Sequence, residues 1–256
     1  SSPRRLDMIG VALLTVGAAL ITGPLALGPG LGWPPQGWAT LAVGVAVLAG
    51  FTWWQYHLRR IERSPLLDPT ILSVRGMGSG LAALLLSSTS YTGILYCVAA
   101  QLQDHHQASP LAAGLDLLPF AVGFGLGSVF GSVVPPDRHR ALVVAGLVAL
   151  GGGMVGLAAV TWAGGWPAVP AGLLLGVAGL GYGASFSPLI GLTVAHVDHH
   201  RVADASGIST TTFQFSFVLG VAAFGSVFTA TGIGVALTAM SGLALLAIVP
   251  VAGWLR

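Results

Sequence analysis

The sequence has few charged residues and a single cysteine. Charged side chains make up 7% of its 256 residues and hydrophobic ones 54%, and the mean hydropathy is +0.85. A soluble domain carries about 25% charged residues, so this chain could not cover a water-facing surface. Cys97 has no partner for an intrachain disulfide, and no thiolate metal site is indicated. The composition therefore predicts an integral membrane protein.

The apolar residues fall into eight long blocks. Each is about as long as the 20 residues that cross a bilayer as a helix, and most of the breaks are turn-forming, although the last, TATGIG, is weak. Such blocks indicate helices, because a backbone in lipid must bond internally and no alternating barrel pattern is present. The predicted spans cover residues 8–27, 37–58, 77–100, 111–134, 141–163, 168–195, 206–230 and 233–255.

The arginines support this count. With eight spans, all ten lie on one side of the membrane, and the loops near Gly30, Asp104, Gly165 and Gly232 contain none. The positive-inside rule places the arginine side, and with it both chain ends, in the cytoplasm. The seven tryptophans lie at predicted span ends, as an aromatic belt requires. The pI of 9.1 thus reflects topology, and no concentrated basic face indicates nucleic-acid binding.

The chain begins SSPRRLDMIG, without an initiator methionine. A positive start before an apolar run is also typical of a signal peptide, but the small-residue cleavage site is unconvincing. We expect Ser1 to be a cut inside a longer protein.

Many of the 38 glycines lie inside predicted spans. Glycines spaced by four let helix backbones approach closely in a membrane. Helix packing is the favoured interpretation, although helices that slide or rock would need the same pattern. The spaced sets are Gly123, Gly127 and Gly131; Gly172 and Gly176; and Gly179 and Gly183.

Polar residues also lie inside spans. The third span carries SSTSYTG, in which Ser87 and Tyr91 share a helix face. Serine and threonine can bond to carbonyls of their own helix, which is the favoured interpretation for them. Gln214 in the seventh span lies roughly 12 Å from the cytoplasmic end. It must face protein or water, and a place on a pathway is as well supported as a packing role.

Asp116 is the only charge in the stretch SPLAAGLDLLPFAVGFGLGSVFG, roughly 9 Å along the helix from the outer boundary. A carboxylate within a span costs a few kcal/mol, so it should face a cavity or a partner. Burial there would favour the protonated acid and suit proton exchange, and the carboxylate could also pair with a lipophilic cation. An interfacial aspartate held by water and the helix start is the alternative, slightly less favoured.

No motif indicates an enzyme. The stretch HVDHHR, with His196, Asp198, His199 and His200, has no matching cluster elsewhere, so a solvated polar linker is favoured over a metal site. The histidines of the outer loop, at positions 105 and 106, are read in the same way. Serine-nucleophile, zinc-protease and P-loop patterns are not found.

Four stretches together resemble the major facilitator superfamily, specifically its fourteen-helix drug:proton antiporters. They are PLLDPTIL, SPLAAGLDLLPF, GLGYGASFSPLIGLTVAHV and VADASGISTTTFQFSFVLGVAAFGSVF. The resemblance implies an all-α integral membrane fold of eight transmembrane helices. Residues 1–62 would form the two extra central helices, 63–76 a cytoplasmic linker and 77–256 the six-helix C-terminal bundle. That bundle would be two inverted three-helix repeats, with the third and sixth spans facing a central pathway, flanked by the fourth and seventh.

The resemblance also implies roles for particular residues. Asp116 would serve cation recognition or proton exchange in the efflux of drugs or hydrophobic and cationic compounds, with protons as coupling ion and no other cofactor. Gln214, Tyr91 and Ser87 would line the substrate and proton pathway. Relatives often carry an Arg-Gln pair where this chain has Phe213 and Gln214, so only the glutamine carries over.

The stretch PPDRHR looks like a decayed Asp-Arg loop motif. Asp137, Arg138 and Arg140 are its remnants. They would act in gating or packing, although simple positive-inside anchoring is favoured for them.

The family pattern places six further helices before Ser1. We therefore expect the chain to need a missing N-terminal half as partner, besides the bilayer and a small-molecule substrate, in a bacterial plasma membrane. Two alternatives remain: a non-transporting scaffold or assembly subunit that docks through its glycine faces, and an intramembrane enzyme. The enzyme would need paired groups at one depth, whereas Asp116 and Gln214 approach from opposite faces.

Overall fold

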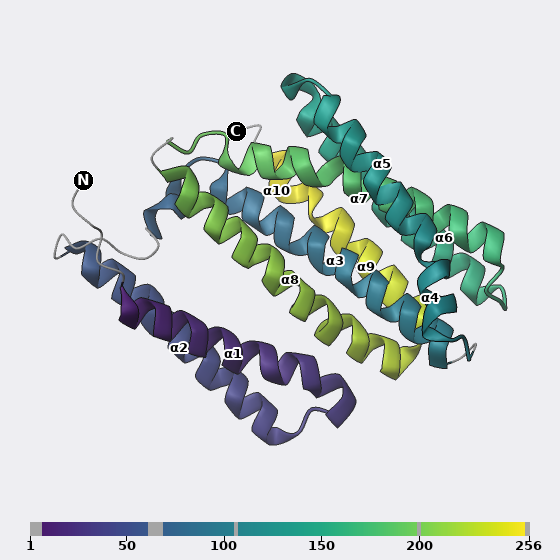
Figure 1. Cartoon of the computed structure of the whole chain (residues 1–256), viewed down its shortest axis with the longest axis horizontal. Coiled ribbons are helices and arrows are strands. Elements are labelled where there is room, and N and C mark those ends of the chain that lie inside the picture. The colour runs from purple at the N-terminus through teal and green to yellow at the C-terminus, as the bar shows by residue number, and fades with distance from the viewer. Residues whose placement is uncertain (1–6, 61–68, 105–106, 199–200, 254–256) are drawn as a thin grey trace.

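The computed structural model describes residues 7–60, 69–104, 107–198 and 201–253. These residues are nearly all helical and include no strand (Figure 1). In chain order the elements are α1 Met8–Leu31, α2 Pro35–Arg60, the 3₁₀ turn η1 Pro69–Ser73, α3 Met77–Asp104, α4 Pro110–Asp116, α5 Leu118–Val133, the 3₁₀ turn η2 Pro136–Arg138, α6 His139–Trp162, α7 Ala168–Val194, α8 Val202–Thr231, α9 Ile233–Leu246 and α10 Ile248–Ala252.

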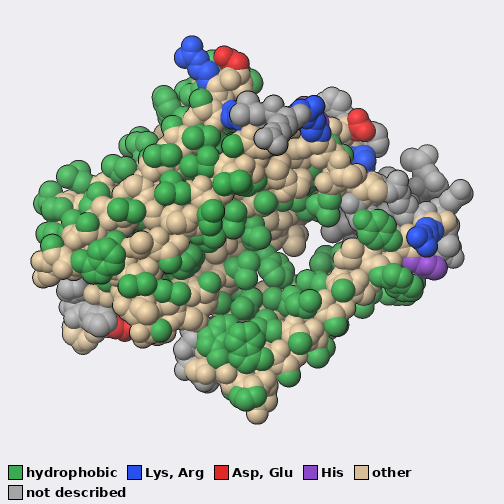
Figure 2. Space-filling model, turned by 180° about the vertical axis from the view of Figure 1, so that it is seen from behind, with side chains coloured by type: hydrophobic (Ala, Val, Ile, Leu, Met, Phe, Trp, Pro, Cys, Tyr) green, Lys and Arg blue, Asp and Glu red, His purple; other side chains and the backbone are tan. Residues whose placement is uncertain are grey.

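The predicted all-α membrane fold is confirmed. Within the described residues seven helical segments are long and apolar enough to cross a bilayer, and α4 with α5 makes an eighth when the bent pair counts as one span. Each coincides with one of the eight predicted spans, although α3 extends to Asp104 and α8 begins at Val202, earlier than expected. On the face shown in Figure 2, hydrophobic side chains are spread over the helices and charged ones are few, as expected of a lipid-facing surface.

The fourth span is broken, which the sequence analysis did not predict. It starts as expected, because Ser109 accepts a hydrogen bond from the Ala112 amide (3.2 Å) and Pro110 occupies the first turn. The break follows at Leu117, where the axes of α4 and α5 differ by 41°. Pro119 explains it, since proline has no amide hydrogen to donate and its ring clashes with the preceding turn.

The bundle of α3 to α10 is built around α3 and α7. Helix α3 contacts α7, α8 and α9, while α7 lies between α5 and α6 and also contacts α3 (Figure 1). The pairs follow a two-fold pattern: α5 packs on α7 as α8 packs on α3, and α6 packs on α7 as α9 packs on α3. Two three-helix repeats, each starting with one of the two central helices, would give this arrangement.

Hydroxyl groups of α3 bind three other helices. Ser88 Oγ lies 2.8 Å from Tyr182 Oη of α7, Ser90 Oγ donates to the Met240 carbonyl of α9 (3.0 Å), and Thr92 Oγ1 donates to the Ser216 carbonyl of α8 (3.0 Å). The favoured expectation of own-helix bonding is confirmed for Ser87, which donates to Ala83 (2.8 Å). It also holds for Ser90 and Thr92, whose hydroxyls reach carbonyls of α3 as well as of a second helix. The polar segment therefore joins helices where little hydrophobic force acts between them.

Glycines bring α5 and α7 into backbone contact. A Cβ added at Gly127 would meet the Leu180 carbonyl and, at 2.8 Å, the Ala184 amide of α7; one added at Gly123 or Gly131 would likewise meet the α7 backbone. From the other side, a Cβ at Gly183 would collide with the Phe124 carbonyl of α5. The predicted packing role of the glycines is thus confirmed at this pair, which has the most extensive contact in the bundle.

Helices α1 and α2 form a hairpin beside α8 (Figure 1). Asp7 caps α1 by accepting from the Gly10 amide (2.9 Å), and its two oxygens also accept from Trp54 Nε1 (3.1 Å) and Gln55 Nε2 (3.0 Å) of α2. Burial alone would raise the pKa of Asp7, but these hydrogen bonds outweigh it and lower the pKa below its usual value. The carboxylate is therefore held charged where the open ends of the hairpin meet.

The division into residues 1–62, 63–76 and 77–256 stays a prediction. Residues 63–68 of the expected linker lie outside the described part of the chain, and η1 occupies most of the rest. A hydrogen bond from Trp33 Nε1 to Ser226 Oγ (2.9 Å) joins the α1–α2 turn to α8.

Candidate functional site

Seven aromatic side chains from four helices form a continuous cluster, here called the aromatic wall. They come from α3, α5, α7 and α8, the helices expected to surround a pathway. Its members are Tyr91, Phe120, Phe124, Tyr182, Phe186, Phe213 and Phe217.

Tyr91 lies at the centre of the aromatic wall. Its ring stacks on Tyr182 with centroids 4.5 Å apart and planes 14° apart, and it also faces Phe120 (5.8 Å) and Phe124 (6.0 Å). Phe217 meets it edge-on at 6.0 Å. Offset and edge-on pairs at these distances are favourable beyond the area they bury, so Tyr91 holds α3, α5, α7 and α8 in one arrangement.

The wall continues from α7 to α8. The ring centroid of Phe186 lies 5.7 Å from that of Tyr182 and 5.1 Å from that of Phe213. The ring centroids of Phe213 and Phe217 are 5.0 Å apart. The rings therefore make an unbroken path between helices that otherwise touch little.

Close backbone packing makes these ring contacts possible. The carbonyls of Phe120 and Phe124 lie where a Cβ at Gly179 or Gly183 would be, so any larger residue would push α5 and its rings away from α7. The hydrogen bond between Tyr182 and Ser88 fixes the orientation of the Tyr182 ring. The glycine pattern and the aromatic wall are thus parts of one structure.

The aromatic wall is buried on one side and accessible on the other. Tyr182 and Phe120 are almost fully buried, whereas Tyr91, Phe124, Phe186 and Phe213 are half-buried and Phe217 is 37% exposed. Accessible π faces attract apolar surface and also cations, which bind above an aromatic ring. The arrangement can therefore bind hydrophobic or cationic organic molecules.

Sequence analysis found only Tyr91 of these seven residues. A signal was present, because three spans each carry an aromatic pair spaced by four, and such pairs share a helix face. The pairs are Phe120 with Phe124, Tyr182 with Phe186 and Phe213 with Phe217. What the spacing alone lacked was the information that the three faces converge.

Asp116 lies at the end of α4, at the break before α5. It is one turn along the chain from Phe120, the first ring of the wall on that span, and its side chain is exposed. The described residues of this chain therefore do not bury the carboxylate. The structure does not bring it together with Gln214.

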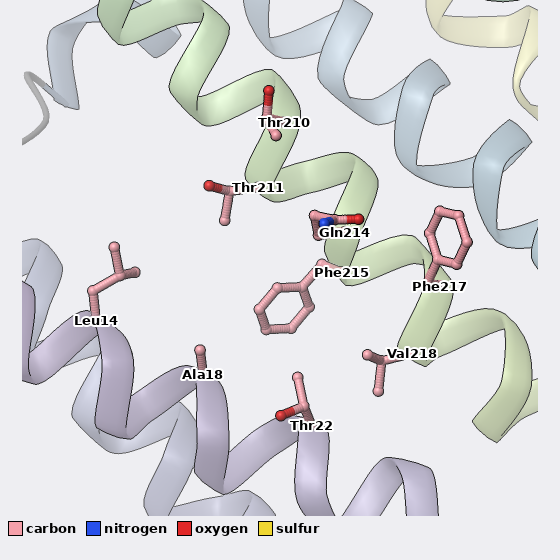
Figure 3. A pocket seen from close by; sticks show the side chains of 9 residues that line it. All are labelled: Leu14, Ala18, Thr22, Thr210, Thr211, Gln214, Phe215, Phe217 and Val218. Carbon is pink, nitrogen blue, oxygen red and sulfur yellow. The ribbon is translucent and has the colours of Figure 1, made fainter.

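Gln214 lines a groove between the hairpin and the bundle, with a volume of about 480 Å³. Leu14, Ala18 and Thr22 of α1 point toward α8 across it, and Thr211 and Phe215 of α8 point back (Figure 3). The Thr211 hydroxyl is bonded within its own helix, to Gly207 (2.9 Å), so the groove is largely apolar. Phe217 is also counted among the lining residues of the groove, but its ring lies on the side of α8 nearer α3 (Figure 3).

The remnants of the loop motif lie at the opposite end from Asp116. Asp137 and Arg138 are exposed, and Arg140 donates from Nη2 to the Ala252 carbonyl (2.9 Å) at the end of α10. His196 and Asp198 of HVDHHR are exposed too, while His199, His200 and the histidines 105 and 106 lie outside the described residues. Within the described residues, His, Cys, Asp and Glu form no group of three able to hold a metal.

Comparison with known proteins identifies relatives of the chain. No family model matches the chain. It is, however, 33% identical over 230 residues to a probable actinorhodin transporter of Streptomyces coelicolor, 29% over 234 residues to the puromycin resistance protein pur8 of Streptomyces alboniger, and 28% over 235 residues to an uncharacterized MFS-type transporter of Mycobacterium tuberculosis. The alignments cover 88% to 89% of this chain.

The chain is thus similar over most of its length to transporters of the major facilitator superfamily. It spans 39% to 44% of the length of these relatives. The resemblance seen in the four sequence stretches is thereby confirmed. For a major facilitator bundle, the aromatic wall lies on the four helices that the resemblance assigns to the pathway.

Proposed function

We propose that the chain forms the C-terminal part of a secondary transporter that exports hydrophobic or cationic small molecules in exchange for protons. The observation that carries the proposal is the aromatic wall near the middle of the membrane-spanning helices. The names of the relatives support it, since one is a probable actinorhodin transporter, one a puromycin resistance protein and another the drug efflux pump JefA. No cofactor besides the coupling proton is part of the proposal.

The other wall of the cavity would come from further helices of the complete protein. The chain spans about two fifths of its relatives' length, which supports a missing N-terminal half as partner. Major facilitator transporters rock two halves around a site at the bilayer midplane. The accessible side of the aromatic wall is the surface that would close against the second half.

Asp116 is proposed to bind the cation or exchange the proton. A carboxylate within a span faces a bundle interior or a water-filled cavity, because exposure to lipid is costly. The described part of this chain leaves Asp116 uncovered, so we infer that the missing half covers it. Its place one turn before Phe120 would put it beside one end of the aromatic wall.

The test is proton-dependent efflux of a cationic dye by the complete protein. The Asp116→Asn variant should lose roughly tenfold or more of this efflux, because the amide can neither release a proton nor neutralise a cation. Asp104→Asn is the matched control, since Asp104 is exposed at the same end of the bundle and lies at the end of α3. Undiminished efflux in Asp116→Asn would remove Asp116 from the mechanism.

We propose that three residues line the pathway, with different degrees of structural support: Tyr91, Gln214 and Ser87. Tyr91 has the strongest support from its place in the aromatic wall. Gln214 would line a lateral extension of the cavity toward α1. Ser87 is buried and bonded to its own helix, so it would affect the local geometry of α3 more than it would contact the substrate.

We propose that the arginine end of the bundle is cytoplasmic and that the membrane is a bacterial plasma membrane. Arg75 and Arg140 line one cavity at this end, and Arg201 Nη2 donates to Thr70 beside it (2.9 Å). Single cysteines at Gly165 and Asp137 in a protein with Cys97 replaced should react with an impermeant maleimide from outside and from inside, respectively. Labelling with the two sides exchanged would reverse the orientation.

The scaffold alternative has less support. Glycine contacts are used inside the bundle, between α5 and α7, and so do not indicate a docking face for another protein. We also propose that the chain is not an enzyme, since its transporter relatives fit transport and Asp116 and Gln214 do not form a pair of reacting groups.

A further inference from the structure

A second cavity, of about 520 Å³, lies at the arginine end of the bundle. Arg75 before α3, Arg140 in the first turn of α6 and His196 just after α7 all line it. Neither Asp nor Glu is among its described lining residues. Positions far apart in the sequence thus place three basic side chains around one space.

Both arginines lie at the N-terminal end of a helix, where the helix dipole disfavours a positive charge. The N-terminus of a helix carries partial positive charge, and acidic residues normally occupy its first turn. Neither α3 nor α6 has an acidic residue there, and no side chain caps α6. The positive potential of two helix ends therefore adds to that of two guanidinium groups, and an anion in the cavity would neutralise both.

Arg140 keeps binding capacity in this arrangement. One of its five N–H groups donates to the Ala252 carbonyl (2.9 Å), which holds the guanidinium at the cavity. The planar group can still present a pair of donors to phosphate oxygens.

The apolar surroundings favour a lipid over a free ion. The cavity is also lined by Leu192, Ala195 and Pro250, and Val249 beside it is 65% exposed. An anion held by the arginines would thus have its apolar tails on an exposed hydrophobic helix surface. Basic pockets between transmembrane helices on the cytoplasmic side bind anionic lipid headgroups in this way.

We propose that this cavity binds the headgroup phosphate of an anionic phospholipid. The lipid would bridge the starts of α3 and α6 and the ends of α7 and α10. The inference does not depend on the proposed transport activity, because the site lies at the opposite end from Asp116 and its test measures lipid binding alone.

The test is native mass spectrometry of the complete protein, released from vesicles that contain phosphatidylcholine with or without phosphatidylglycerol. The wild type should retain phosphatidylglycerol in preference to phosphatidylcholine. The Arg75→Gln and Arg140→Gln double variant should lose roughly thirtyfold of this preference and each single variant roughly fivefold, as expected for lost charges near an anionic surface. Arg60→Gln, which removes an exposed arginine at the end of α2, is the control and should keep the preference.

Other outcomes of the same experiment would overturn the proposal. Equal retention of phosphatidylglycerol by wild type and double variant would mean that the cavity is not the site. Displacement of the lipid by inorganic phosphate, with equal retention of the two lipids, would indicate a simple anion site instead. If the double variant fails to fold, His196→Gln and Arg75→Lys at exposed positions replace it, with a weaker preference expected in the first and a largely preserved one in the second.

Discussion

The Gly127→Leu variant is expected to fold poorly or not at all. A Cβ at this position already meets the backbone of Leu180 and Ala184, and backbone atoms cannot rotate away as a side chain can. Helices α5 and α7 would have to separate, at a cost of about 3 kcal/mol or more, the upper range for an overpacked core. The yield of monodisperse protein in size-exclusion chromatography and its thermal unfolding in mild detergent would measure the effect.

Gly125→Leu gives the matched control. Gly125 lies on the same helix two residues earlier, is exposed, and has no atom within 4 Å of an added Cβ. It receives the same side chain and should behave close to wild type. Equal stability of the two variants would show that α5 and α7 are not packed backbone to backbone.

The second large effect is expected at Tyr91. In Tyr91→Ala the ring that stacks on Tyr182 at 4.5 Å is lost, and with it the partly accessible π face at the centre of the aromatic wall. A desolvated cation–π contact contributes about 2 kcal/mol, so efflux of a cationic aromatic dye by the complete protein should fall roughly thirtyfold. A neutral dye of similar size should lose much less.

Two variants separate recognition from structure. Tyr91→Phe keeps the ring and removes the hydroxyl, and it should export the dye nearly as well as wild type. Phe130→Ala removes an exposed ring of α5, outside both the aromatic wall and the groove, and should have little effect. If Tyr91→Ala transports both dyes as wild type does, the aromatic wall is packing only.

The number and placement of the helices followed from the sequence because lipid imposes a strong constraint. A span must be about 20 residues long, almost without charge, and bounded by polar or turn-forming residues. The apolar blocks of this chain satisfy that constraint one by one, so the eight spans could be identified without knowing their neighbours. The break at Leu117 was missed, although Pro119 is the visible cause, because a proline early in a span can also be accommodated without a break.

The candidate site was only partly predictable. Asp116 and Gln214 stood out because a polar side chain in a span is costly wherever it points, but the direction of each depends on neighbouring helices. Gln214 was found to line the groove between α8 and α1, and Asp116 to lie uncovered at a helix break. The aromatic residues carried no such cost and so gave no signal individually.

The sequence by itself determined that this protein is a set of membrane-spanning helices with its arginines at one end, because length, hydropathy and charge act on each segment separately. Only the tertiary structure decided which faces meet. The glycines of α5 and α7 bring two backbones together, that approach places Phe120 and Phe124 against Tyr91 and Tyr182, and Arg75 and Arg140 come to share one cavity. These are contacts between residues far apart in the chain, and their geometry is set by packing, which no single segment contains.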